Sequence, residues 1–473
     1  MKFLQGKFFL PTIILSLFSF LLVLVLLSDG FSGGGDSIAH FRISRYAFKY
    51  PHLFLDHWGK PVFTIISAPF SQIGFNGIRL YNILAGLLTA NLSFLIAKLL
   101  KKDNSILVIL LIAFAPIYFE LFFSGLTEIS FSLVLISSVF FALKEKYSTS
   151  AIILSFLPFV RTEGILIIII FFFVLLLYRE YKSIPYLFVG YLLFSFIGWA
   201  YYDDFFWVIH KMPYTGASQI YGHGELFHFV KALPHIMGFP LLLLFTLGLI
   251  ILLSSLRKSR NIDDQKWKEF LFIFIPFFTY FSAHSFVWWK GLGSSLGLLR
   301  VMAGILPLAA ILALDGYNML FNALKRSSIT KYAFSSLVIL TVIYIPFSWQ
   351  KYPMKLGDQE RTLEAAASWV KESPYFENKI FYYDLFFLFK LGIDPYDTAR
   401  CFERVPERKN PGKGMPPGSI VQWDAHYAPN EGGMPLEVLL NNENFTLLKK
   451  FLPEYPIKVL GDYDYEVYIF KRN

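Results

Sequence analysis

The chain has 473 residues, of which 55% are hydrophobic and only 16% are charged. Soluble domains carry about 25% charged residues, so this composition excludes a soluble globular protein. Repeated apolar stretches of about 20 residues predict a polytopic α-helical membrane protein instead. The net charge of +9 does not indicate nucleic-acid binding, because the basic residues lie in short clusters between apolar stretches, where the positive-inside rule places them. The single cysteine, Cys401, excludes an intrachain disulfide.

Eleven apolar stretches are predicted to cross the membrane. The first, 8–28, follows Lys2 and Lys7; it is too long for a signal peptide and no A-x-A cleavage site follows it, so we expect a retained span with a cytoplasmic N-terminus. The others are 78–100, 105–123, 128–143, 149–160, 165–178, 184–200, 235–256, 269–285, 300–314 and 332–347. Each predicted inner loop carries Lys or Arg, and the odd number places the C-terminus outside. If the two short stretches around Arg161 form one re-entrant hairpin, the number falls to nine and both termini keep their sides.

Two domains are expected. Residues 1–349 form the transmembrane domain, whose first outer loop, 29–77, contains interfacial helices over 37–48 and 62–73. From residue 350 the composition becomes mixed: 358–372 has the pattern of an amphipathic helix, 379–383, 419–423 and 466–470 have that of strands, and 437–451 that of one or two short helices. Residues 350–473 are therefore predicted to be a soluble, extracytoplasmic α/β domain.

The first outer loop gathers charged groups that could carry chemistry. Asp36 follows three glycines and lies four residues before His40, on the same helical face. Capping of the helix and a catalytic role explain Asp36 equally well. Lys60 precedes Pro61, and proline is favoured at the first position of a helix. Lys60 would then stand at a helix N-terminus, which suits a phosphate, although a lysine reaching to the lipid headgroups is an equally good explanation.

Other charged groups lie at the predicted outer ends of spans. Glu128 begins the fourth span, and Arg300 begins a late span after a Gly- and Ser-rich loop. Arg161 and Glu163 end the fifth span, where simple pairing with each other and a functional role explain them equally well. Asp203 and Asp204 suit a divalent cation, but no third ligand is evident, which favours a solvated loop pair. Asp384 and Asp424 each end a predicted strand, where both ligand sites and turns are common.

In order along the chain, these motifs resemble those of the GT-C superfamily of glycosyltransferases, near the protein mannosyltransferase and aminoarabinose transferase branch. The motifs are the acid Asp36 after a Gly-rich turn, Lys60-Pro61 between two interfacial helices, Arg79-Leu80 opening the second span, Thr127-Glu128, the Arg161–Gly164 sequence R-T-E-G, and Arg300 followed by Pro307. Val301 stands where the family usually has Tyr, and Ser37 replaces a second acid in the first loop. The similarity covers about residues 1–350.

The resemblance implies a hexosyl- or pentosyltransferase that moves a sugar from a polyprenyl-phosphate carrier to a glycan, lipid or protein hydroxyl. It implies an extracytoplasmic active face in a bacterial plasma membrane, inversion at the anomeric carbon, and catalytic carboxylates at Asp36, as general base, and Glu128. Lys60, Arg300, Arg161 and His40 would bind the donor phosphate. No cofactor is required, but the missing second acid leaves a divalent cation open. A polytopic transporter or lipid-linked-sugar flippase is the alternative, which the gathering of charges at the outer interface disfavours. The sugar, the acceptor and the carrier length cannot be read from the sequence.

Overall fold

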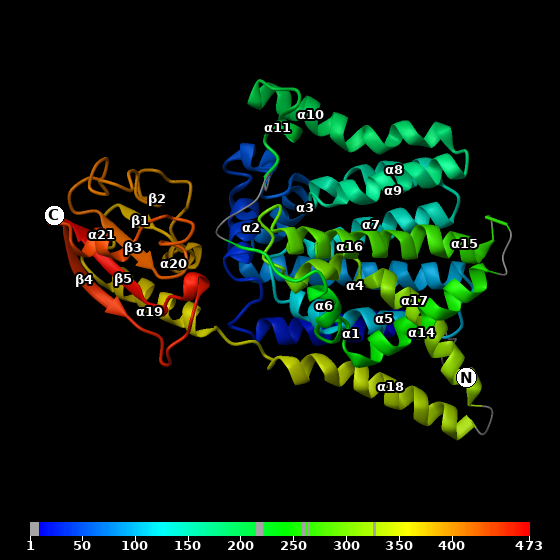
Figure 1. Cartoon of the computed structure of the whole chain (residues 1–473). Helices are drawn as coiled ribbons and strands as arrows, with labels where there is room; N and C mark the ends of the chain where they lie inside the picture. The colour runs from blue at the N-terminus through cyan, green and yellow to red at the C-terminus, as the bar shows by residue number, and fades with distance from the viewer. Residues whose placement is uncertain (1–8, 214–220, 258–260, 263, 325–327) are drawn as a thin grey trace. The chain divides into compact units, whose positions relative to one another are not determined.

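The computed structural model describes residues 9–213, 221–257, 261–262, 264–324 and 328–473 (Figure 1). The chain forms two compact units: unit 1 comprises Met1–Ser28 and Ile43–Met354, and unit 2 comprises Asp29–Arg42 and Lys355–Asn473. The change from unit 2 to unit 1 falls inside helix α2 (Gly34–Tyr46), after Arg42. Lys2 and Lys7, on which the predicted N-terminal orientation depends, lie outside the described residues.

Unit 1 is built from helices. They are α1 (Phe9–Leu26), α3 (Pro61–Ser71), α4 (Phe75–Leu99), α5 (Leu107–Ala113), α6 (Pro116–Leu121), α7 (Glu128–Leu143), α8 (Tyr147–Ser155), α9 (Gly164–Leu177), α10 (Val189–Tyr202), α11 (Trp207–His210), α12 (His228–Lys231), α13 (Leu233–Met237), α14 (Phe239–Leu256), α15 (Gln265–Glu269), α16 (Ile275–Lys290), α17 (Leu306–Ala323) and α18 (Ser328–Trp349). Short 3-10 turns cover Pro51–Leu55, Leu157–Phe159, Tyr181–Phe188 and Leu299–Gly304, and a π-helical turn, Phe270–Phe274, joins α15 to α16.

Within the described residues, seven helical runs are long and apolar enough to cross a membrane: Phe9–Leu26, Phe75–Leu99, Tyr181–Tyr202, Phe239–Leu256, Gln265–Lys290, Leu306–Ala323 and Ser328–Trp349. The chain is therefore an integral membrane protein. The remaining predicted spans are also helical but shorter, among them α7 and the pair α8 and α9 on either side of Arg161. Figure 1 shows α7, α8, α9 and α16 running alongside one another.

One predicted span is interrupted. The stretch 105–123 was expected to be continuous, but α5 ends at Ala113 and α6 begins at Pro116. Proline disfavours helical geometry at the residue before it, and Ala115 is accordingly extended, with φ −64° and ψ 131°. The proline thus ends one helix and begins the next at its favoured first position.

Small residues allow a close helix contact in unit 1, between α14 and α17. A Cβ added at Gly248 would lie 2.0 Å from the Leu312 carbonyl oxygen, and one at Gly316 would lie 2.2 Å from the Leu244 carbonyl oxygen. The two backbones therefore touch only because these positions lack side chains, which is the usual way in which helices approach closely in membranes.

Unit 2 contains a five-stranded sheet in the order β2-β1-β3-β5-β4. The strands are β1 (Ile380–Tyr382), β2 (Cys401–Glu403), β3 (Ile420–Asp424), β4 (Phe445–Phe451) and β5 (Val467–Arg472), with helices α19 (Asp358–Glu372), α20 (Leu385–Leu391) and α21 (Leu436–Leu440). β1 pairs in parallel with β2 and β3, whereas β5 pairs antiparallel with β3 and β4. The predicted helix 358–372 and the three predicted strands correspond to α19, β1, β3 and β5.

The prediction for 437–451 was wrong in its second half. Only Leu436–Leu440 is helical, and Phe445–Phe451 forms the edge strand β4, paired with β5. Its sequence, FTLLKKF, does not alternate strictly, and the pairing contains a register shift between Leu447 and Lys449. A bulge of this kind breaks the period of two on which sequence recognition of a strand depends.

Candidate active site

Lys60 lies where the sequence predicted, at the N-cap of α3 with Pro61 as the first helical residue. Its backbone adopts a positive φ of 66°, which is uncommon for a residue with a side chain. The Lys60 ammonium is buried and donates a hydrogen bond to Thr162 Oγ1 at 2.9 Å. Burial lowers the pKa of Lys60 to about 8, against the opposing attraction of Glu163.

Glu128, the first residue of α7, joins two arginines. Its carboxylate is fully buried and lies 2.7 Å from Arg161 Nη1 and 3.5 Å from Arg300 Nε. Glu128 is thus placed to hold Arg161 and Arg300 in position.

Arg161 also holds the acid two residues away, as the R-T-E-G sequence suggested. Its Nη2 lies 2.9 Å from Glu163 Oε1, and its Nη1 donates to Thr127 Oγ1 at 3.2 Å. Burial acts to raise the pKa of Glu163, but Arg161 and then His284 outweigh it and lower that pKa to about 2. Glu163 is therefore an anion at any physiological pH.

These contacts bring together residues from four separate parts of unit 1. We call the set Lys60, Glu128, Arg161, Glu163 and Arg300 the Arg161 cluster. It combines three cationic and two anionic side chains, and its ion pairs join α7, the turn before α9 and the turn before α17. The sequence identified each member, but only the Arg161–Glu163 pair among the contacts, because the other partners are far apart in the chain.

Asp36 lies in unit 2, in the first turn of α2. The three glycines before Asp36 are required for two reasons, backbone conformation and space. Gly33 and Gly34 have positive φ, 87° and 50°, a conformation that glycine adopts without strain. Gly35 has no room for a side chain, because a Cβ there would lie 2.5 Å from Tyr427 Oη. The carboxylate of Asp36 is close enough to Tyr427 to add to the effect of burial in raising the pKa of that phenol.

His40 was expected to bind the donor phosphate with Lys60, Arg161 and Arg300. It lies on the unit 2 part of α2 and is nearly buried, whereas the three cations belong to unit 1. The neighbouring Arg42 joins the first outer loop to the rest of unit 2: its Nη2 lies 2.8 Å from Glu403, and its Nη1 donates to Tyr382 Oη at 3.3 Å.

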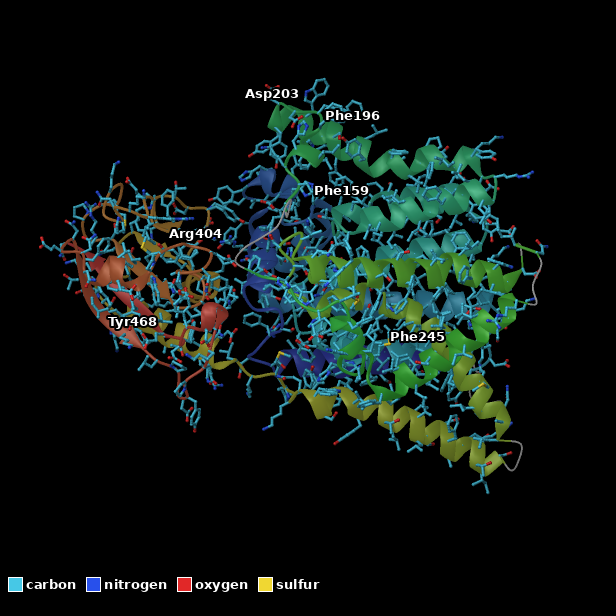
Figure 2. All side chains as sticks on the ribbon, in the orientation of Figure 1. Phe159, Phe196, Asp203, Phe245, Arg404 and Tyr468 are labelled. Atoms are coloured by element: carbon cyan, nitrogen blue, oxygen red, sulfur yellow. The ribbon has the colours of Figure 1, made fainter. Side chains whose placement is uncertain are left out.

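Asp203 and Asp204 form the turn that follows α10. Asp203 ends α10 in the left-handed conformation (Figure 2). Asp204 accepts the Phe206 N–H at 2.8 Å and lies 2.8 Å from His210 Nδ1. In the described part of the chain, no three His, Cys, Asp or Glu side chains are grouped so that they could hold a metal ion.

Asp384 and Asp424 end the neighbouring parallel strands β1 and β3. Asp384 accepts the Phe386 N–H and begins α20, and Asp424 accepts the N–H groups of His426 and Tyr427. Burial raises the pKa of both carboxyls, that of Asp424 to about 6. Their hydrogen bonds fit the turn explanation.

A second charged cluster was not foreseen. Lys102, Lys266, Glu269 and Asp315, which we call the Lys102 cluster, form a buried network in which each ammonium contacts both carboxylates. In the sequence, Lys102 lies in the predicted inner loop between the spans 78–100 and 105–123, where the positive-inside pattern alone explains it. A signal was present in Asp315, an acid within an otherwise apolar helix, because such residues are usually paired.

The chain matches known proteins in fold and not in sequence. No family model matches the chain, and no curated protein matches its sequence. Among solved structures, it is similar to ArnT from Cupriavidus metallidurans bound to undecaprenyl phosphate, with a TM-score of 0.64, 11% identity and 98% of each chain covered. The apo state of ArnT gives a TM-score of 0.63 at 12% identity over 97% of each chain. The resemblance suggested by the motifs is thus confirmed for the fold, which this chain shares with ArnT over nearly its whole length.

Proposed function

We propose that this protein is an integral membrane glycosyltransferase that moves a sugar from a polyprenyl-phosphate carrier to an acceptor hydroxyl. The observation that carries the proposal is the fold, which matches over 98% of both chains a transferase solved with undecaprenyl phosphate. The cation-rich Arg161 cluster supports the same proposal, because a lipid phosphate needs buried or half-buried cations at the membrane interface.

The phosphate is assigned to Lys60, Arg300 and Arg161. Lys60 stands beside the first turn of α3, where free N–H groups and the helix dipole favour an anion. Arg300 and Arg161 are held by Glu128, so their guanidinium groups are fixed before the donor arrives. Glu128, proposed from the sequence as a second catalytic carboxylate, is assigned this positioning role instead. His40 stays a weaker candidate for the phosphate.

Asp36 is assigned the role of general base. It takes the proton of the acceptor hydroxyl while the acceptor oxygen forms a bond to the anomeric carbon, and the bond from that carbon to the phosphate oxygen breaks with inversion. The carrier leaves as a phosphate anion, which needs no protonation. Lys60 and Arg300 stabilise its developing charge in a site of low dielectric.

The proposed site faces the outside of the cell, in a bacterial plasma membrane, with unit 2 extracytoplasmic. This orientation rests on the Lys and Arg of the predicted inner loops. The acceptor is a glycan, lipid or protein hydroxyl. Lipid-linked sugars and acceptor glycans from a deletion strain, analysed by mass spectrometry, identify both substrates: the donor should accumulate and the glycosylated acceptor should disappear.

The sharpest test of the mechanism is Asp36→Asn, assayed with the substrates so identified. Asparagine keeps the shape and can still cap the helix, but it cannot accept a proton. We expect turnover to fall about a hundredfold or more, with donor affinity and thermal stability unchanged. Asp203→Asn is the matched control, since Asp203 only ends α10, and it should keep parental turnover. An Asp36→Asn protein that transfers sugar at the parental rate would contradict the assignment.

A further inference from the structure

Two polar side chains on one face of α16 border the Arg161 cluster and are not used by the proposed mechanism. Tyr280 and His284 lie one helical turn apart, with ring centroids 4.5 Å apart. His284 Nε2 is 3.8 Å from Glu163 Oε1, and Tyr280 lies within electrostatic reach of Arg161, Glu163 and Glu128. Both side chains therefore face the same charged cluster from α16.

Among the described residues, neither side chain has a hydrogen-bond partner for its buried polar atom. Tyr280 is completely buried, and its hydroxyl forms no hydrogen bond although it lies near Arg161. Nε2 of His284, itself about nine-tenths buried, likewise lacks a hydrogen-bond partner. Two other buried tyrosines of unit 1 are paired: Tyr118 with Ser132 and Tyr81 with Ser130. Because an unsatisfied buried polar group is unfavourable, the two that border the Arg161 cluster point to a ligand.

We propose that Tyr280 and His284 form the subsite that binds the sugar of the lipid donor. The inference rests on the proposed function. The sugar is bonded directly to the phosphate, so groups that bind it must lie beside the cations that bind the phosphate. A hydroxyl and an imidazole, each able to donate or accept, match the hydroxyls of a sugar.

The test compares lipid probes on the full-length protein in nanodiscs. The probes are undecaprenyl phosphate alone and undecaprenyl phosphate carrying glucose, mannose, galactose or aminoarabinose. In the wild type, at least one of these sugars should tighten binding about tenfold or more over the bare lipid, as one or two good hydrogen bonds would. Tyr280→Phe and His284→Leu should each remove most of that gain and leave binding of the bare lipid unchanged.

A stability measurement separates ligand binding from a structural role. Tyr280→Phe removes an unsatisfied hydroxyl, so the midpoint of thermal unfolding should stay the same or rise. Tyr118→Phe, the matched control, breaks a satisfied buried hydrogen bond, so it should lower the midpoint and keep the sugar-dependent gain.

The outcomes are distinguishable. If the wild type binds no undecaprenyl phosphate, the proposed function fails and the sugar subsite fails with it. If the bare lipid binds but Tyr280→Phe and His284→Leu keep the full gain from the sugar, or no sugar gives a gain, the subsite alone is wrong.

Discussion

The two charged clusters of unit 1 differ in what borders their ion pairs. In the Lys102 cluster, two ammonium groups and two carboxylates contact one another in every combination. The Arg161 cluster brings three cationic and two anionic side chains together, and the hydroxyl of Tyr280 beside it has no hydrogen-bond partner among the described residues. Burial of charge alone therefore does not distinguish the two clusters. The unsatisfied polar group beside the Arg161 cluster does, and it favours that cluster as the ligand site.

The largest effect expected from this difference is on the free energy of unfolding. Lys102→Met should leave Glu269 buried beside one ammonium instead of two, and breaking a buried ion network of this kind costs about 3–5 kcal/mol. Lys60→Met should change stability little, because burial already makes the Lys60 ammonium unfavourable. Unfolding of each variant and of the wild type in detergent measures the two changes in the free energy of unfolding. Equal losses in the two variants would contradict the distinction between the clusters.

The next effect is on ligand binding. Lys60→Met should weaken binding of undecaprenyl phosphate about ten- to a hundredfold, the range of a hydrogen bond to a charged group. Lys102→Met should bind the lipid with parental affinity when the folded fraction is compared. Lys290→Met, which removes an exposed lysine at the end of α16, controls for a general loss of positive charge. Parental affinity in Lys60→Met would remove Lys60 from the phosphate site.

A smaller effect follows from the pKa of Lys60, which is about 8. Below pH 8 the ammonium is charged; above it the free protein loses the proton, whereas bound phosphate favours the charged form. Affinity for undecaprenyl phosphate should therefore be nearly constant around pH 7, be about twofold weaker at pH 8, where half of the free protein has lost the proton, and weaken by up to about tenfold per pH unit well above that. Lys60→Arg should abolish the dependence, because arginine stays charged. A pH-independent wild type between pH 8 and 9.5 would contradict it.

Much of the fold was predictable because it depends on local patterns. The predicted helix over 128–143 matches α7 in both bounds, since an acid begins the apolar run and Lys144 follows it. The break at Pro116 and the edge strand β4 were not predicted. Pro116 ends a helix inside an apolar stretch that looks continuous in the sequence. In β4 the register shift breaks the alternation by which a strand is recognised, so the segment looks helical.

The candidate site was predictable as a set of residues and not as a set of contacts. Glu128, Arg161 and Arg300 were each identified by their place at a span end, but their ion pairs link positions 33 to 172 residues apart. The same limit explains why Lys102 was assigned to topology alone and why Tyr280 and His284 were not singled out. Residues on an apolar helix gain a role only from what packs against them, which one sequence does not specify.

The last prediction concerns which ends of the helices face the cell exterior and involves no expected energetic change. In a Cys401→Ser background, single cysteines at the exposed positions Lys290, Lys413 and Lys146 report on the end of α16, on unit 2 and on the loop after α7. The distribution of Lys and Arg predicts that a membrane-impermeant maleimide labels the cysteines at 290 and 413 in intact cells and the one at 146 only after lysis. Labelling of all three after lysis is the control for accessibility. The reverse pattern would place the helix end nearest Tyr280 and His284 in the cytoplasm, and the proposed use of an outward-facing lipid donor would fail with it.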